Sequence, residues 1–305
     1  MPFREVYRQQ VALLIRTLPL VAQEKVFALK GGTAINLFVR NMPRLSVDID
    51  LTYLPVEPRD ASLTAIDAAM KRIADRAKKT FENPHVAEGR IQPESIVNRL
   101  NIRVAGVQTK IEVTPVLRGC VSDPSVRDVA KAVEDEFGFA QIQTVSFDDL
   151  YAGKIVAALD RQHPRDLFDY RDLRANEGIN DNLRRAFIVY LLSHDRPMWE
   201  VLQCNPKNIE DEFARGFEGM TEKPVSLNAL YEAREQLKKD IVGGMPQDHR
   251  RFLISFEEGK PEWSLLGVKA AAGLPAVKWR QRNLDKLDAQ RRADLVAGLK
   301  RVLAL

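Results

Sequence analysis

Two short stretches of the sequence decide the fold: LKGGTA at residues 29–34 and RLSVDIDL at residues 44–51. In the first, an apolar run leads into Gly31-Gly32, and apolar residues at helical spacing follow in residues 33–40. In the second, apolar and acidic residues alternate, which is typical of a β-strand with unlike faces. We therefore expect a strand, a glycine turn, a short helix and a second strand that carries two carboxylates on one face.

The pattern before residue 146 mixes helices and strands. Apolar spacing predicts a helix near the start of the chain that ends at Pro19, and a charged amphipathic helix at residues 61–79. Alternating residues on either side of Ala105-Gly106 predict a hairpin within residues 100–113. This part of the chain is therefore expected to form a compact core of mixed secondary structure.

From Ser146 onward the sequence contains no clear strand and predicts helices only. Turns are expected at His163-Pro164, Arg196-Pro197 and Gly243-Gly244. The sequence thus predicts an α+β (mixed α/β) protein with two domains, residues 1–145 and residues 146–305.

Composition restricts the class of protein. Hydrophobic residues make up 45% and charged residues 29% of the chain, which excludes a mainly disordered or fibrous protein. Cys120 and Cys204 are far apart and the four histidines are isolated, so neither a disulfide framework nor a zinc site is expected. The apolar runs are much shorter than the roughly 20 residues that span a bilayer, and the first ten residues lack a signal-peptide core. We expect a cytoplasmic protein with no membrane partner.

Basic residues gather at the two ends of the chain. Residues 1–46 contain seven basic and two acidic side chains, and residues 269–301 contain nine and three. Such an arrangement fits an anionic partner such as nucleic acid, with Trp279 as a stacking surface, but it also fits a solvated basic surface helix.

Three carboxylates are candidates for a metal site. Asp48 and Asp50 lie two residues apart on a predicted strand, so both project from one face. Their mutual repulsion and their hard oxygen atoms favour Mg²⁺, with Mn²⁺ as a possible substitute. Glu112, on the hairpin strand between apolar neighbours, would complete a two-metal site for phosphoryl transfer. The alternative for Glu112 is an outward residue paired with Lys110 or Arg103.

Gly31-Gly32-Thr33 lies between a strand and a helix, where backbone amides can hold the phosphates of a nucleotide. Arg44 and Ser46 would add a charge and a hydroxyl to the same phosphates. The alternative is a purely structural turn, and no Walker lysine follows the glycines.

A further group of polar residues follows residue 146. Ser146 and Asp149 fit a capping box at the start of a helix on which Lys154 and Arg161 share one face. The sequence RDLFD follows at residues 165–169. Taken singly, these residues also fit a solvated helix face and an i,i+4 ion pair.

The Gly-Gly-Thr and Asp-x-Asp block, followed by this Lys and Arg-Asp-x-x-Asp series, resembles the AbiEii/AbiGii (MenT-like) nucleotidyltransferase toxins of type IV toxin–antitoxin systems. The segment RFLISFEEGKPEW at residues 251–263 is also similar to the C-terminal part of these toxins. The resemblance implies a polymerase-beta-like nucleotidyltransferase core at residues 1–145 and a helical C-terminal domain at residues 146–305 that contributes Lys154 and Asp169 to the active site.

The resemblance also implies an activity: transfer of a nucleoside monophosphate from an NTP to an RNA, with the tRNA 3′ end as the expected acceptor, and inhibition of translation and growth. An antitoxin encoded by an adjacent gene is the implied protein partner. The implied catalytic residues are Asp48, Asp50, Lys154 and Asp169, with Glu112 as third metal ligand. The implied nucleotide-binding residues are Gly31, Gly32, Thr33, Arg44, Ser46, Arg161 and Asp166.

Two alternatives remain open at the level of the sequence. The same chemistry could act on a small-molecule or protein hydroxyl. Alternatively, the fold could serve as a catalytically silent module that binds RNA or a partner protein.

Overall fold

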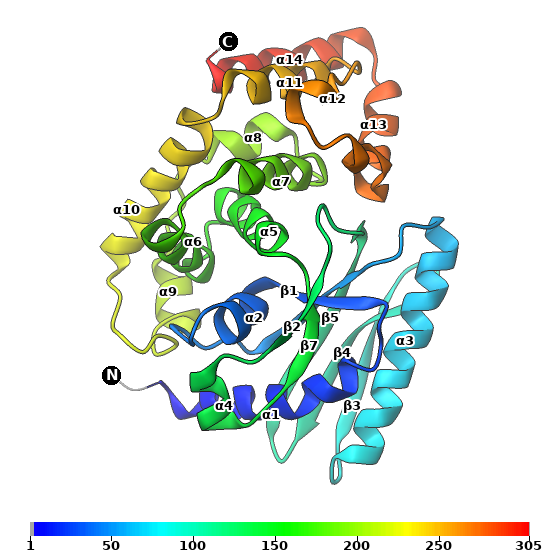
Figure 1. Ribbon diagram of the computed structural model, residues 1–305, viewed down its shortest axis with the longest axis vertical. Coiled ribbons are helices and arrows are strands. Elements are labelled where there is room, and N and C mark those ends of the chain that lie inside the picture. Colours follow the sequence, from blue (N-terminus) through cyan, green and yellow to red (C-terminus); the bar gives the residue numbers. More distant parts are fainter. Residues whose placement is uncertain (1–2, 305) are drawn as a thin grey trace. The chain divides into compact units, whose positions relative to one another are not determined.

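The computed structural model describes residues 3–304, which form two compact units (Figure 1). The first unit comprises the chain through Ser146 together with Glu218–Pro224. The second comprises Phe147–Phe217 and the residues from Val225 onward. The short return segment joins the first unit through its backbone, because the Leu45 amide donates to the Met220 carbonyl at 2.7 Å and Arg44 forms a β-bridge with Thr221.

The first unit is built on a seven-stranded mixed sheet in the order β3-β4-β5-β2-β1-β7-β6 (Figure 1). The strands are β1 (Phe27–Lys30), β2 (Asp48–Tyr53), β3 (His85–Ile91), β4 (Ile96–Val104), β5 (Val107–Arg118), β6 (Ser125–Asp128) and β7 (Gln141–Thr144). β2 pairs antiparallel with β1 and parallel with β5, so it lies near the middle of the sheet. The residues on either side of the glycine turn and its helix, 29–30 and 48–51, therefore lie in adjacent central strands.

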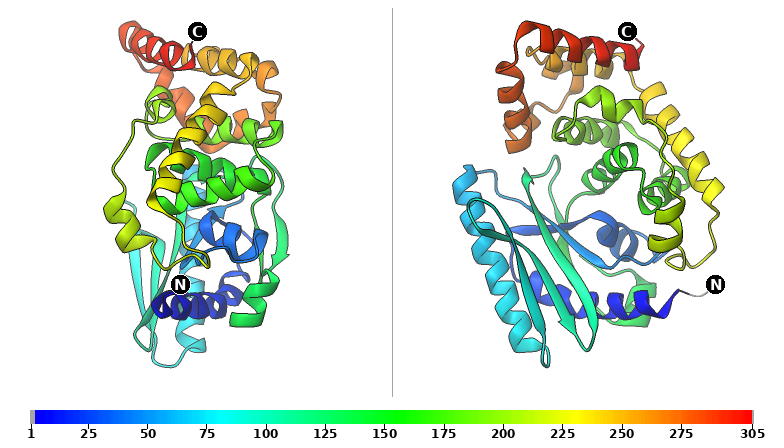
Figure 2. Two further views of the ribbon diagram at one scale, coloured as in Figure 1. Left: turned by 90° about the vertical axis from the view of Figure 1, so that its left-hand side faces the viewer. Right: turned by 180° about the vertical axis from the view of Figure 1, so that it is seen from behind.

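Helices α1 (Glu5–Val21) and α3 (Arg59–Thr80) pack on the sheet and on each other (Figure 2). In α3 the buried residues Leu63, Ile66, Met70 and Ile73 recur at helical spacing, which gives the helix one apolar face. In β2 the alternate residues Ile49 and Leu51 are fully buried. The strand thus contributes its apolar side to the core and leaves Asp48 and Asp50 on the other side.

Smaller elements complete the first unit: α2 (Gly31–Ala34), the π-helical turn η1 (Ile35–Val39) and α4 (Lys131–Phe137). The expected hairpin is present as β4 and β5, and its turn at Ala105-Gly106 has positive φ at both residues. The first helix does not end at Pro19 as predicted: α1 continues to Val21, with Pro19 in its last turn. A proline at that position removes only one backbone hydrogen-bond donor, so the helix can continue past it. Strands β3, β6 and β7 were not predicted from the sequence.

The second unit is helical within the described residues. Its elements are α5 (Phe147–Asp160), α6 (Pro164–Asn176), α7 (Asp181–Leu192), α8 (Met198–Gln203), α9 (Glu210–Gly216), α10 (Leu227–Lys238), η2 (Lys239–Gly243), α11 (Gln247–Glu257), α12 (Trp263–Leu266), η3 (Lys269–Gly273), α13 (Pro275–Asp285) and α14 (Ala289–Leu303). All three predicted turns lie between helices. Between residues 3 and 304, no helix combines the length and the apolar character needed to cross a membrane.

Candidate active site

The glycine turn brings the backbone close to a carboxylate. β1 ends at Lys30 and Gly31 follows with φ of +73°, a conformation that side-chain-bearing residues rarely adopt. A Cβ atom on Gly31 would lie 2.8 Å from Asp50 Oδ2. Gly31 is therefore required both by its backbone conformation and by the approach of Asp50.

We expect Gly31→Ala to destabilise the protein more than Gly106→Ala, which is a matched control. Gly106 has φ of +84° but nothing within 4 Å of its ideal Cβ position, so alanine there costs only the backbone strain, about 1–2 kcal/mol. Alanine at Gly31 adds a clash with Asp50. Thermal melts of the two variants measure the difference. Equal falls in melting temperature would show that the close approach of Asp50 adds nothing to the cost of alanine at Gly31.

The hydroxyls and the guanidinium predicted to bind phosphates are buried. Thr33 Oγ1 donates a hydrogen bond to the Asp48 carbonyl and lies 3.0 Å from Ser46 Oγ. Arg44 is 1% exposed, its Nη1 donates to the Leu45 carbonyl at 2.9 Å, and its Nη2 lies 2.6 Å from the position of a Cβ on Gly32. These side chains fix the turn against the strand that carries the carboxylates. Their contact with phosphates remains a prediction.

Charged residues form two rows across the polar face of the sheet. Register pairs Lys30 with Asp50, Asp50 with Glu112, and Glu112 with Arg99, on four adjacent strands. Asp48 pairs with Lys110 in the neighbouring row. Because paired residues project from the same face, the sheet brings all three predicted carboxylates together as neighbours.

Cations hold both oxygens of Glu112. Arg99 Nη2 donates to Oε1 at 2.8 Å, and Lys110 Nζ donates to Oε2 at 3.1 Å. Burial alone would raise the pKa of Glu112, but these two bonds hold it below its usual value. Burial opposes the charge of Lys110, yet Asp48 and Glu112 raise the pKa of this ammonium. The alternative that pairs Glu112 with Lys110 is thus realised in the structure, whereas Arg103 bonds to Gln108.

Lys30 is a site residue that the sequence reasoning did not single out. Its Nζ donates to Thr114 Oγ1 at 3.1 Å, on the face that carries Asp50. Burial lowers the pKa of Lys30, and the negative charges of Asp50 and Glu112 partly restore it. Its position directly before Gly31, at the end of a predicted strand, is the signal that could have revealed it.

The donor set fits a divalent cation such as Mg²⁺ in its chemistry, since Asp48, Asp50 and Glu112 supply only hard oxygen atoms. Among residues 3–304, no three His, Cys, Asp or Glu side chains already converge as a metal site. Glu112 already forms ion pairs with Arg99 and Lys110. To bind a metal ion, Glu112 would have to release at least one of these two side chains.

The second unit contains a compact ion-pair cluster on α5, on α6 and at Arg161, which lies just past the end of α5. Lys154 Nζ lies 2.7 Å from Asp166 Oδ1 and 3.0 Å from Asp169 Oδ2. Arg161 binds Asp166 through two bonds, Nε to Oδ2 at 2.6 Å and Nη2 to Oδ1 at 3.0 Å. Pro164 begins α6 and the His163 ring accepts a bond from the Arg165 amide, which fixes the turn between the two helices. All four predicted residues of this unit therefore meet.

The burial of this cluster corrects one interpretation of the sequence. Lys154 is only 7% exposed and both aspartates are almost completely buried, so Lys154 does not lie on a solvated helix face; Arg161 is 61% exposed. Burial would raise the pKa of Asp166, but the charges of Lys154 and Arg161 hold it well below its usual range. Burial, with a contribution from Arg165, lowers the pKa of His163 to about 4.

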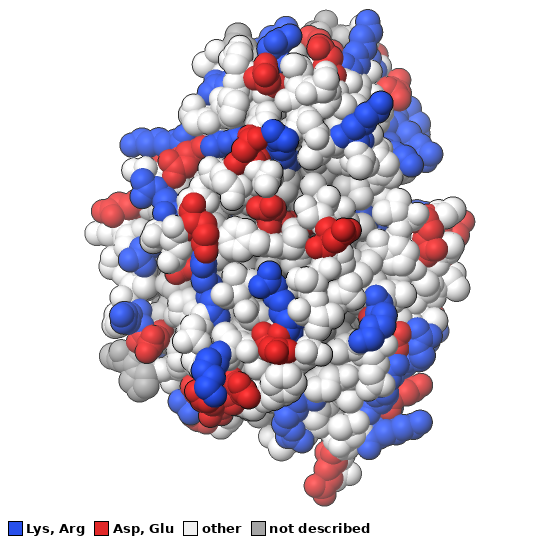
Figure 3. Space-filling model, viewed as in Figure 1, with Lys and Arg blue, Asp and Glu red and all other residues white. Residues whose placement is uncertain are grey.

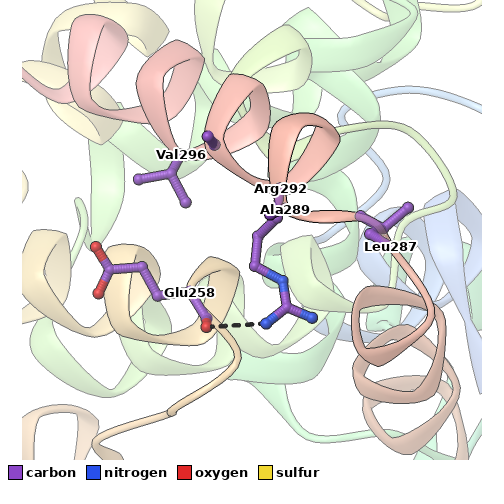
Figure 4. Close-up of a pocket in the computed structure, with 6 residues that line it drawn as sticks. Glu258, Leu287, Ala289, Arg292 and Val296 are labelled. Atoms are coloured by element: carbon purple, nitrogen blue, oxygen red, sulfur yellow. Dashed lines mark hydrogen bonds between the residues drawn. The ribbon is translucent and has the colours of Figure 1, made fainter.

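A pocket of about 500 Å³ lies elsewhere in the second unit, between α14 and the end of α11 (Figure 4). Its lining residues are Glu258, Leu287, Ala289, Arg292, Ala293 and Val296. Arg292 Nη1 donates to the Glu258 carbonyl at 3.4 Å across it. None of the predicted site residues lines this pocket.

Comparison with known proteins gives a consistent result. A family model described as the nucleotidyl transferase AbiEii toxin of type IV toxin–antitoxin systems matches residues 12–281. A search of curated proteins found no match. Among solved structures, the chain is similar to MenT4, a nucleotidyltransferase toxin from Mycobacterium tuberculosis, with 14% identity and a TM-score of 0.57 over 97% of this chain and 93% of that chain. The structural similarity establishes a shared fold and confirms the predicted fold class.

Proposed function

Because the chain belongs to the AbiEii family of nucleotidyltransferase toxins of type IV toxin–antitoxin systems, we propose that it transfers a nucleoside monophosphate from an NTP to the 3′ hydroxyl of an RNA. The expected acceptor is tRNA in the cytoplasm, and the expected result is a block of translation and growth. In this reaction the acceptor oxygen bonds to the α-phosphorus, the bond from that phosphorus to the bridging oxygen breaks, pyrophosphate leaves and the hydroxyl proton is released.

The observation that carries the proposal is the placement of three carboxylates on one sheet face beside the glycine turn. Register makes Asp50 the neighbour of Glu112, and Asp48 projects from the same face. In the proposal, Asp48 and Asp50 would hold a divalent ion for the triphosphate, and Glu112 together with Asp48 would hold an ion for the acceptor hydroxyl. When bound, Mg²⁺ or Mn²⁺ would supply charge neutralisation and acidity to the hydroxyl.

Phosphate binding is assigned to the turn. Gly31 and Gly32 present backbone without side chains next to Asp50 and Arg44, so the triphosphate could approach closely. Thr33, Arg44 and Ser46 keep this backbone fixed against β2. Their support makes the turn rigid before the nucleotide arrives.

Lys154 is proposed to neutralise charge on the leaving pyrophosphate. Asp166 and Asp169 bind its ammonium from two sides and thereby fix its direction, while Arg161 extends from Asp166 toward solvent. In this proposal the two aspartates position the lysine and Arg161 contacts the nucleotide. The participation of these residues in one active site with Asp48 and Asp50 rests on family membership.

Acceptor binding is assigned to basic residues of the second unit. On α13, Lys278 and Arg282 are exposed and Trp279 is 59% exposed, and Lys and Arg side chains gather at the edge of this unit in Figure 3. Exposed basic and aromatic side chains suit RNA phosphates and unstacked bases. Arg280 is different: only 11% of its side chain is exposed, and it donates to the carbonyls of His194 and Arg196, so it is engaged within the helical unit.

We expect labelled NTP incubated with total RNA and Mg²⁺ to mark species of tRNA size at their 3′ ends. Higher salt should weaken RNA capture steeply, because each phosphate contact releases counterions. The measurement is gel analysis of the label before and after 3′ exonuclease treatment. Co-expression with the protein of the adjacent gene, the expected antitoxin, should restore growth.

The alternatives give different results in the same assay. Label found only in a small hydroxyl compound or in protein would show that this class of molecule, and not RNA, is the acceptor. Absence of label in every fraction, with RNA still captured, would favour a silent binding module.

A further inference from the structure

Lys110 places a positive charge between two of the proposed metal ligands. Its Nζ lies 3.1 Å from Glu112 Oε2 and 4.0 Å from Asp48 Oδ1. β5 and β2 are parallel neighbours, and their register sets Lys110 directly opposite Asp48. The ammonium thus lies in the gap that an ion shared by Asp48 and Glu112 would need.

Three cations near these carboxylates, Lys30, Arg99 and Lys110, differ in their surroundings. Lys30 is held by Thr114, and Arg99 approaches Glu112 from the opposite strand and binds its other oxygen. The Lys110 side chain is one third exposed and has a long flexible stem. The Arg99 side chain is 47% exposed, so exposure does not distinguish the two cations. Their positions do: Lys110 Nζ reaches both Asp48 and Glu112, so Lys110 is the cation that an ion in this gap would displace, while Arg99 can stay on Glu112 Oε1.

We propose that Lys110 is an internal cation that occupies the gap between Asp48 and Glu112 in the metal-free enzyme and leaves it when a divalent ion binds there. This inference rests on the proposed function of the carboxylates. A divalent ion at about 2.1 Å from carboxylate oxygens and an ammonium cannot share this gap, since like charges at such distances repel strongly.

The exchange makes metal binding depend on the nucleotide. Without substrate, Lys110 and Arg99 balance the charge of Glu112, so a divalent ion gains little there. The triphosphate adds negative charge next to Asp48 and Asp50, which favours additional positive charge and the displacement of Lys110. The enzyme would then complete its metal site only when an NTP is present.

Mn²⁺ alone, without nucleotide, is the probe. We expect Lys110→Met to lower the Mn²⁺ concentration at half-saturation at least tenfold relative to the unchanged protein, as measured by electron paramagnetic resonance. In chelator, Lys110→Met should melt at a lower temperature because three carboxylates lose a cation, and Mn²⁺ should restore it. Lys110→Arg, which keeps the charge, should retain the weak Mn²⁺ binding of the unchanged protein.

Lys71→Met is the matched control, because it also replaces a lysine of an ion pair with methionine but does so on α3, where Lys71 Nζ lies 2.6 Å from Asp67 Oδ2. It should leave Mn²⁺ binding unchanged. Lys110→Gln provides a second neutral variant if Lys110→Met does not fold, and it is expected to bind Mn²⁺ more tightly as well. Equal or weaker Mn²⁺ binding by the folded neutral variant, with Asp48→Asn still abolishing binding, would overturn the role of Lys110 and leave the proposed function intact. Unchanged Mn²⁺ binding by Asp48→Asn would instead remove the metal role of the carboxylates.

Discussion

Lys154→Met is expected to lose both stability and transfer activity. The ammonium is buried between Asp166 and Asp169, so its removal deprives two buried carboxylates of a cation. Breaking a buried ion pair from one side costs about 3–5 kcal/mol, which corresponds to a fall on the order of 10 °C in the melting temperature. If Lys154 also neutralises the leaving pyrophosphate, the transfer rate should fall about a hundredfold or more.

A double variant separates the two effects. Lys154→Met/Asp169→Asn removes a negative charge together with the lysine, and Arg161 remains on Asp166. We expect this variant to regain much of the lost stability while its transfer rate stays low. Recovery of both stability and rate would mean that Lys154 is a structural counterion without a part in catalysis. Thermal melts and single-turnover transfer assays on the same preparations give the answer.

Asp48→Asn should abolish transfer and growth arrest while leaving the protein folded. The side chain is 31% exposed, so the change costs no core packing, and the lost contact with Lys110 at 4.0 Å is offset by weaker repulsion from Asp50 and Glu112 on the same face. In the proposed function Asp48 would help to hold both divalent ions, so a loss of at least about a hundredfold in rate is expected. Colony formation on induction without antitoxin, together with a transfer assay and a melt, measures this.

Asp75→Asn is the control for this experiment. Asp75 lies on the exposed side of α3 with Lys78 at 3.6 Å, so the same change of a carboxylate to an amide there should leave arrest and transfer intact. Growth arrest that persists with folded Asp48→Asn would assign the toxicity to binding rather than to catalysis.

Local patterns in the sequence predicted the central elements of the first unit well. The alternation around Asp48 and Asp50 requires a strand with a polar face, and Gly31 allows the sharp turn before it. The hairpin turn at Ala105-Gly106 is equally local, since its two positive φ angles are set by adjacent residues. Such features depend on a few neighbouring residues, so they can be recognised without knowledge of the fold.

Strands at the margins of the sheet escaped prediction. β3 and β6 carry mixed polar residues, and neither contains a fully buried side chain. β7 is only four residues long. Their strand conformation comes from pairing with a neighbour rather than from an apolar period. β3 pairs with β4 and β6 with β7, while β7 also pairs with β1, which is far away in the sequence.

The sequence by itself determined the identity of the charged residues, the face on which the two aspartates lie and the order of the motifs that led to the family. Tertiary structure decided what each charge contacts. Glu112 lies beside Asp50 because β5 pairs with β2, two segments far apart in the sequence whose register no local pattern fixes, and the burial of Lys154 follows from the packing of α5 against α6. Side-chain periodicity is a property of one strand or helix, whereas ion pairing and desolvation depend on the elements packed around it, and only the folded chain brings those together.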